Sequence, residues 1–297
     1  MKKELSILLP TYNCRCKELV MLLQMQCEGN LDYEIIVADD GSPNRHFVEE
    51  NRAIEKLKNV RYIIRKENVG RSAIRNFLAN EAKYQWLLFI DGDLSIENTH
   101  FIKNYMDSNG DVVVGGVKIG GEEDMWFDNL RYRYEKKCEP AHTMENRRKN
   151  SHKEFRTTNF VVHKDIILAH PFEENVRHYG YEDVIFGKEL CENNIGITHI
   201  NNPVLIDDFE CNADFLKKNE EALRTLHQFR NELRGYSKLL DNLQKIEKMQ
   251  MLSLVHFFYR LFRKAIKHNL FGNNPSVFLF NVYKVLYYVN LMYNDKK

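Results

Sequence analysis

The first hundred residues alternate between short apolar runs and helical patterns, and this alternation restricts the fold more than any other feature. Five runs fit strands: residues 5–10, 33–38, 60–64, 86–90 and a run beginning at 112–114. Helical patterns occupy residues 17–26, about 45–58, and 72–82. Strands that are apolar throughout are typical of a parallel sheet covered on both faces. Right-handed crossovers then predict a doubly wound α/β layer.

Polar clusters follow three of these runs directly. They are Thr11-Tyr12-Asn13, Asp39-Asp40 and Asp91-Gly92-Asp93. In open α/β sheets, ligands bind outside the carboxyl ends of the strands. We therefore expect the three clusters to converge on one edge and to form a binding site there.

The rest of the chain has a different pattern. Residues 135–155 are polar with few apolar anchors, which predicts a mobile loop, either a lid or a surface excursion. Residues 160–163 fit a short strand, and residues 182–192 fit a helix with acidic residues in its first turn. From about Ala213 onward the pattern is helical.

Composition excludes several classes of protein. The formal net charge of +1 in 297 residues gives no bulk attraction for nucleic acid, and we expect no nucleic-acid partner. The six cysteines show no disulfide framework, which favours free thiols in a reducing compartment. The first apolar run is too short for a signal sequence, and no stretch is long enough to span a bilayer. We expect a cytoplasmic protein.

Asp91 and Asp93 are two carboxylates at the end of a buried strand, where a cation would compensate their charge. Hard oxygen ligands suit Mg²⁺ or Mn²⁺, which also bind phosphate oxygens. Gly92 permits close backbone approach. The alternative is an ordinary solvated turn.

Three further segments are candidates, each with a plain structural alternative. An aspartate at 39–40 can bind a base or a ribose hydroxyl, or only cap a turn. In the segment 68–76, Gly70, Arg71 and Arg75 can bind an anion at a helix start, or form an exposed basic face. In 180–183, a carboxylate can act as a general base, or only cap the following helix.

No P-loop, dinucleotide fingerprint or nucleophile elbow is present, which disfavours a kinase, a dehydrogenase or a hydrolase.

Taken in order, residues 8–13, 39–42, 68–76 and 91–93 resemble the family 2 glycosyltransferases of the GT-A fold. The resemblance covers roughly residues 4–215. It implies a Rossmann-like, mostly parallel sheet flanked by helices, here with a helical C-terminal extension.

The resemblance also implies roles for particular residues. The nucleotide, usually uridine, would be held by Pro10, Thr11, Tyr12, Asn13, Asp39, Asp40, Asn68, Gly70, Arg71, Arg75, Asp91 and Gly92. Mn²⁺ or Mg²⁺ would be bound by Asp93 with Asp91. Sugar and acceptor would lie beside Thr158, Asn159 and Tyr181. Asp183, next to Glu182, would be the catalytic base.

One difference from the family pattern concerns the metal. Relatives often supply a histidine after the sheet, and the corresponding segment 202–210 contains none. Asp207 or Asp208 would then serve, or water would fill the position.

We therefore expect an inverting, metal-dependent hexosyltransferase that moves a sugar from a UDP-sugar to a hydroxyl of a glycan or lipid-linked saccharide, as in bacterial surface polysaccharide synthesis. The alternatives are an inactive relative that binds a nucleotide sugar, and a sugar nucleotidyltransferase. The expected domains are a catalytic domain at 1–212, with a nucleotide-binding half at about 1–115 and an acceptor half at about 116–212, and a helical extension at 213–297.

The C-terminal segment 251–297 is basic and aromatic. It holds seven Lys or Arg and one acid, a net charge of +6. Basic and aromatic residues recur at helical spacing, which suits a helix on the inner face of an anionic plasma membrane. The alternative is a helical cap that packs on the catalytic domain.

Overall fold

The computed structural model describes residues 2–29 and 31–295. The chain forms two compact units. The α/β unit comprises Met1–Gly120, Ala141–Arg177 and Glu182–Asp207. The helical unit comprises Gly121–Pro140, His178–Tyr181 and Asp208–Lys297. The helical unit thus includes two short segments that lie before the expected boundary at residue 212.

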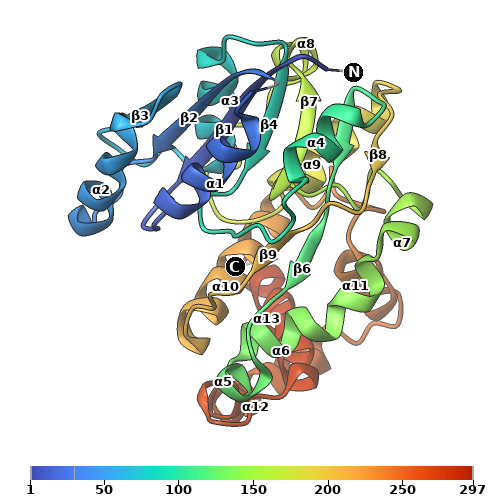
Figure 1. Ribbon diagram of the computed structural model, residues 1–297. Helices are drawn as coiled ribbons and strands as arrows, with labels where there is room; N and C mark the ends of the chain where they lie inside the picture. The colour runs from blue at the N-terminus through green and yellow to red at the C-terminus, as the bar shows by residue number, and fades with distance from the viewer. Residues whose placement is uncertain (1, 30, 296–297) are drawn as a thin grey trace. The chain divides into compact units, whose positions relative to one another are not determined.

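The α/β unit is built on a seven-stranded sheet of order β3-β2-β1-β4-β7-β5-β8 (Figure 1). The strands are β1 (Glu4–Thr11), β2 (Asp32–Asp39), β3 (Val60–Ile64), β4 (Trp86–Ile90), β5 (Val112–Val114), β7 (Asn159–His163) and β8 (Thr198–His199). All pairs are parallel except those of β7, which runs antiparallel to β4 and β5. The predicted mostly parallel sheet is confirmed. A second sheet pairs β6 (Val117–Ile119) with β9 (Val204–Ile206).

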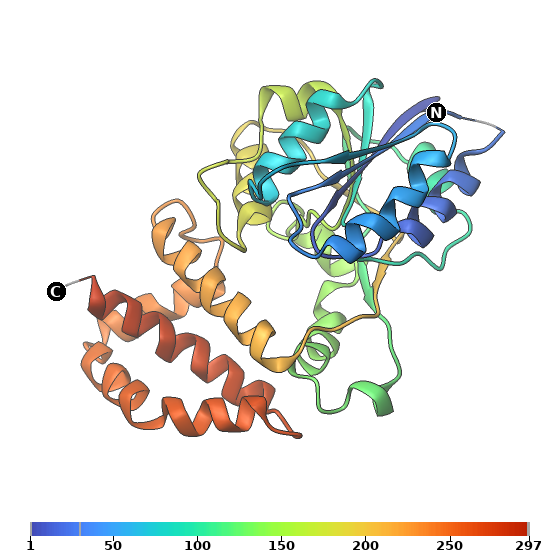
Figure 2. The ribbon, with the colours of Figure 1, turned by 90° about the vertical axis from the view of Figure 1, so that its left-hand side faces the viewer.

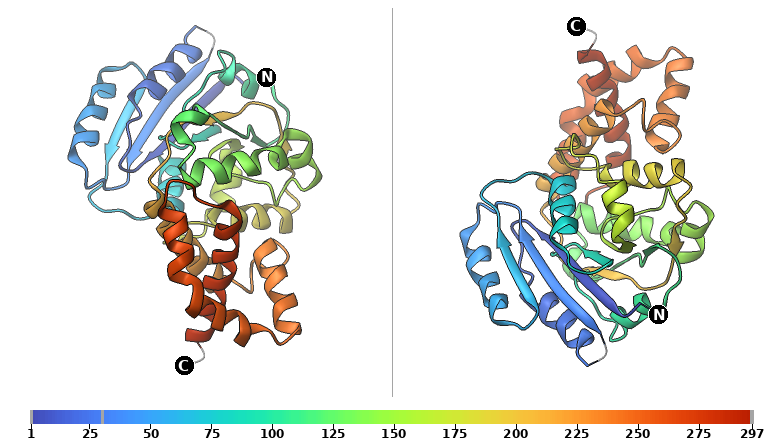
Figure 3. Two further views of the ribbon diagram at one scale, coloured as in Figure 1. Left: turned by 90° about the horizontal axis from the view of Figure 1, so that it is seen from below. Right: turned by 90° about the horizontal axis from the view of Figure 1, so that it is seen from above.

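Both faces of the large sheet are buried, as the continuous apolar strands predict. Along β1, Ile7 belongs to one core and Leu8 to the other, because successive side chains point to opposite faces. The first core contains α1 (Lys17–Cys27) and α4 (Phe101–Asp107), and the 3₁₀ helix η1 (Arg52–Lys56) that follows α2 (Arg45–Asn51). The second contains α3 (Arg71–Glu81), α8 (Lys164–Ala169) and α9 (Glu182–Glu192). Figure 3 shows α1 and α3 on opposite sides of the strands.

The predicted mobile loop at residues 135–155 is wrong. The segment contains the end of α6 (Leu130–Cys138), the 3₁₀ helix η2 (Glu139–His142) and α7 (Met144–Lys149). The side chain of Arg147 is buried, and its guanidinium donates hydrogen bonds to the carbonyls of Val114, Gly115 and Ile200. A polar residue therefore anchors this segment, in a way that its sequence pattern does not reveal.

The helical unit confirms the helical pattern of the tail. Its helices are α5 (Glu123–Trp126), α6, α10 (Asn212–Gln228), α11 (Lys238–Lys248), α12 (Leu252–Phe271) and α13 (Val277–Asn294). Phe215 on α10, Ile266 on α12 and Phe280 on α13 share one hydrophobic core. Figure 2 shows α12 and α13 packed side by side. None of the helices in the described ranges is long and apolar enough to cross a membrane.

Candidate active site

Backbone hydrogen bonds join the ends of the neighbouring strands in the α/β unit. The Asp40 N–H donates to the Thr11 carbonyl at 2.9 Å, and the Gly92 N–H donates to the Pro10 carbonyl at 3.2 Å. A Cβ at Gly92 would lie 2.4 Å from Cγ2 of Thr11, so only glycine allows this approach. The predicted convergence of the three polar clusters on one sheet edge is therefore observed.

Asp39 and Asp40 hold the loops that follow the strands. Asp39 accepts hydrogen bonds from the N–H (2.8 Å) and hydroxyl (2.5 Å) of Ser42. Asp40 accepts from the N–H groups of Val69 and Gly70, each at 3.0 Å. Burial raises the pKa of Asp40 above its usual value, and the two N–H donors partly oppose this. Both carboxylates are buried, and they shape the loops in which we expected the nucleotide.

Tyr12 and Asn13, which follow β1, have different surroundings. Asn13 has a left-handed backbone with φ of 51°, its N–H donates to the Ser42 hydroxyl at 2.8 Å, and its Oδ1 accepts from the Asn44 N–H. Tyr12 is 48% exposed. Asn13 is therefore part of the loop framework, whereas Tyr12 presents an aromatic ring to solvent.

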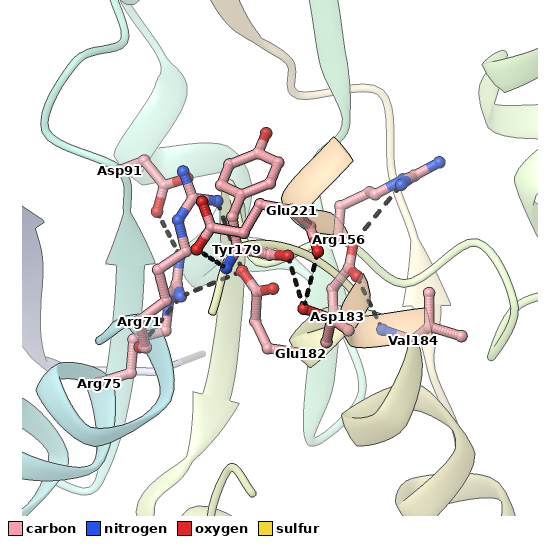
Figure 4. Close-up of polar contacts among 10 residues, drawn as sticks. Arg71, Arg75, Asp91, Arg156, Tyr179, Glu182, Asp183, Val184 and Glu221 are labelled. Atoms are coloured by element: carbon pink, nitrogen blue, oxygen red, sulfur yellow. Dashed lines mark hydrogen bonds and ion pairs between the residues drawn. The ribbon is translucent and has the colours of Figure 1, made fainter. Parts of the chain in front are cut away.

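Arg75, on α3, lies between Asp91 at the end of β4 and Glu182, the first residue of α9 (Figure 4). Its Nη2 is 2.6 Å from Oδ1 of Asp91, and its Nη1 is 3.8 Å from Oε1 of Glu182. Arg71 reaches the same Glu182 oxygen at 3.4 Å. Arg75 is 1% exposed and Glu182 is 4% exposed, so this is a buried charge network. The anions that Arg75 contacts in the structure are these two carboxylates.

Asp183 differs from the adjacent Glu182. Its Oδ1 accepts from the Val184 N–H at 2.8 Å, and its Oδ2 is 3.4 Å from Nη1 of Arg156 (Figure 4). Burial raises the pKa of Asp183 above its usual value, Arg156 opposes the rise, and Glu182 adds to it. A raised carboxyl pKa suits a general base. Sequence reasoning missed Arg156, although it stands directly before the Thr157-Thr158-Asn159 segment.

Thr158 and Asn159 were both expected beside the sugar, and their side chains have different surroundings. Asn159 is fully buried, donates to the carbonyls of Gly116 and Asn202 at 2.9 Å, and accepts from the Tyr105 hydroxyl. Both the NH₂ group and the oxygen of its side-chain amide are therefore hydrogen-bonded within the protein. The buried hydroxyl of Thr158 has no hydrogen-bond partner within residues 2–29 and 31–295. An unsatisfied buried hydroxyl fits a substrate contact better.

The two expected metal ligands, Asp91 and Asp93, have different surroundings. Asp91 is held by Arg75, and Asp93 is exposed. Burial raises the pKa of Cys14 to about 12, and the charges of Asp93, Asp39 and Asp91 contribute to this rise. The aspartates thus create a negative field that a divalent cation would offset.

Candidates for further protein ligands come from the end of β9. An isolated antiparallel bridge pairs Ser95 with Leu205, and the Ser95 hydroxyl donates to Asp207 at 2.5 Å. Asp207 therefore belongs to the same unit as Asp93, whereas Asp208 belongs to the helical unit. The described residues contain no group of three or more His, Cys, Asp or Glu side chains placed to hold a metal ion. Asp91 and Asp93 offer oxygen donors that would suit Mg²⁺ or Mn²⁺.

Solved structures with the same fold include the following two. The mannosyltransferase PcManGT from Pyrobaculum calidifontis, solved with GDP-Man and Mn²⁺, is 10% identical with a TM-score of 0.57, covering 99% of this chain and 87% of that one. Residues 1–349 of S. aureus TarS are 17% identical with a TM-score of 0.51, covering 100% of this chain and 92% of that one. These similarities identify the GT-A type of fold and confirm the predicted fold class.

Sequence comparison assigns the family. The chain is 38% identical over 106 residues to the chondroitin synthase of Escherichia coli, a match covering 35% of this chain and 15% of the synthase. The family model described as glycosyl transferase family 2 matches residues 6–169, more than half of the chain. This range includes the four segments on which the resemblance was based. The protein belongs to glycosyl transferase family 2.

Proposed function

We propose that the protein transfers a sugar from a UDP-sugar to a hydroxyl of a glycan or lipid-linked saccharide, with inversion at the anomeric carbon. The observation that carries the proposal is the position of Arg75. One buried side chain contacts both Asp91, in the proposed diphosphate motif, and Glu182, next to the proposed base Asp183. The residue proposed to bind the donor and the residue proposed to activate the acceptor would thus be held in one framework by Arg75.

The nucleotide would bind at the edge formed by β1, β2 and the start of α3. Tyr12 provides an exposed ring on which a base can stack. Asp39 and Asp40 hold the loops around it, and Gly70, with φ of 91°, starts α3 where N–H groups favour an anion. Uridine is the expectation from the family resemblance. GDP is the alternative to test, since the mannosyltransferase of similar fold was solved with GDP-Man.

The site also suits a divalent cation. Asp93 would bind Mn²⁺ or Mg²⁺ together with Asp91, which pairs with Arg75. Asp207, which accepts from the Ser95 hydroxyl in the same unit, is a candidate for a further ligand. Asp208 remains a proposed alternative. When bound, the cation would neutralise charge that develops on the departing diphosphate.

In the proposed reaction, Asp183 takes the proton from the acceptor hydroxyl. The hydroxyl oxygen then attacks the anomeric carbon on the face opposite the departing nucleotide. Glu182, paired with Arg71 and Arg75, positions Asp183 rather than reacting itself. The Thr158 hydroxyl, which has no hydrogen-bond partner among the described residues, is available to the sugar or the acceptor.

A donor screen tests the proposal. Nucleotide release is measured with UDP-, GDP- and dTDP-sugars and a panel of glycan acceptors, with Mn²⁺, Mg²⁺ or EDTA. We expect acceptor-stimulated release of UDP that requires a divalent cation. The matched controls are Asp183→Asn, which should lose release, and the exposed Asp165→Asn, which should retain it. Donor binding without release, under all these conditions, would favour the inactive-relative alternative.

A further inference from the structure

Helix α12 carries an apolar face that points away from its core. Leu254, Phe257, Phe258, Leu261 and Phe262 are between 39% and 58% exposed. Their spacing of three and four residues places them on one side of the helix. The buried residues of α12 form a separate stripe that packs into the core of the helical unit. The helix is therefore apolar on two sides, and packing within the helical unit explains only the buried side.

The same helix is strongly basic. Arg260, Arg263, Lys264 and Lys267 lie within its 20 residues, which contain no Asp or Glu. Lys267 pairs with Glu220 at 2.8 Å, and Arg263 lies over the ring of Tyr259. In the described chain, no carboxylate lies within 4.0 Å of Arg260 or Lys264. At 3.6 residues per turn, these two side chains lie along one edge of the apolar face, next to Phe257.

We propose that α12 binds the surface of an anionic lipid bilayer. The exposed Phe and Leu side chains enter the boundary between headgroups and acyl chains, while Arg260 and Lys264 contact lipid phosphates. The helix lies in the plane of the interface, because no helix of the described chain can span a bilayer. This inference does not depend on the proposed reaction.

A second copy of the chain fits this face less well. In an antiparallel symmetric contact through the apolar face, the edge that carries Arg260 and Lys264 would lie beside the same edge of the second copy, and the like charges would repel. Anionic headgroups instead neutralise both residues, while the neighbouring apolar face enters the boundary between headgroups and acyl chains. Charge complementarity therefore favours the lipid surface.

Vesicle flotation of the full chain tests the inference. We expect binding to phosphatidylcholine vesicles that contain phosphatidylglycerol, weak binding to pure phosphatidylcholine, and loss of binding at high salt. Each Lys or Arg at an anionic surface strengthens binding roughly fivefold, so Arg260→Glu/Lys264→Glu should weaken it by about 25-fold or more. Phe257→Ser/Leu261→Ser should weaken it even at low salt.

Matched controls change exposed residues outside α12. Lys56→Glu/Lys58→Glu reverses two charges on the α/β unit, and Phe278→Ser removes a phenylalanine of α13 that is 69% exposed. Both should bind vesicles like the original chain, and circular dichroism should show that all variants are folded. Equal binding to charged and neutral vesicles, or no loss in the α12 variants, overturns the proposal. The proposal is also overturned if the original chain is a dimer that does not bind vesicles, and if Phe257→Ser/Leu261→Ser converts that dimer to a monomer.

Discussion

Replacing Arg75 by methionine tests whether the buried charge network holds the site together. The substitution keeps much of the side-chain volume but removes the partner of Asp91 at 2.6 Å and of Glu182 at 3.8 Å. Glu182, only 4% exposed, would retain Arg71, whose side chain is 46% exposed. Removing one partner of a buried ion pair costs about 3–5 kcal/mol, because the remaining charge stays buried. We expect a loss of this size in the stability of the α/β unit.

Urea unfolding can report on this unit alone. The chain has two tryptophans, and Trp86 lies on β4 whereas Trp126 lies in the helical unit. In a Trp126→Phe background, fluorescence therefore follows the α/β unit. With a slope of roughly 1–3 kcal/mol per molar urea, the midpoint for Arg75→Met should fall by at least about 1 M.

Two further variants make the result specific. Arg61 on β3 is 46% exposed and pairs with Glu81 at 3.1 Å, so Arg61→Met should cost no more than about 1 kcal/mol. Arg75→Lys keeps the charge but lacks the planar guanidinium that reaches both carboxylates. Its loss of stability should therefore lie between those of Arg75→Met and Arg61→Met. If Arg75→Met were no less stable than Arg61→Met, the network would not hold the site and the reasoning would be wrong.

Three predictions concern catalysis. Asp183→Asn should reduce sugar transfer about 10²- to 10⁴-fold with donor affinity retained, because a general base is lost; near-normal transfer would remove Asp183 from that role. Arg156 lowers the pKa of Asp183, so Arg156→Gln should raise that pKa and move the acidic limb of the kcat/KM profile to higher pH; an unchanged limb would argue against Asp183 as the titrating group. Asp93→Ala should abolish the Mn²⁺ dependence of donor binding in calorimetry, and an unchanged affinity would refute its assignment as a ligand.

The strands and the positions of the motifs were predictable because their signals are local. Most of the strands are largely apolar runs that end where polar turn residues begin, and the predicted runs at 60–64 and 86–90 coincide with β3 and β4. Of these two, β4 is a continuous apolar run, whereas β3 includes the exposed Arg61. The helix at 182–192 likewise begins with acidic residues, and it coincides with α9. The direction of β7 was not predictable, because an apolar run does not encode whether it pairs parallel or antiparallel.

The segment 135–155 was mispredicted because its stabilising contacts are not local. Its polar sequence suggested a solvated loop, but Arg147 is satisfied by carbonyl groups at residues 114, 115 and 200. Non-local contacts also give different surroundings to neighbouring candidate residues that the sequence does not distinguish. Asn159 is fully hydrogen-bonded by the protein while the neighbouring Thr158 hydroxyl has no partner in the described chain, and only the folded chain distinguishes them.

The sequence by itself determined the α/β class, the order of the motifs and the family, since these depend on local apolar periodicity and on residue types at strand ends. Only the tertiary structure decided the pairing of charges. Arg75 and Glu182 are 107 positions apart, and either could have faced solvent. Burial brings them together, because a buried charge is stable only beside a partner. Burial also raises the pKa of Asp183. The fold leaves one apolar face of α12 exposed to solvent.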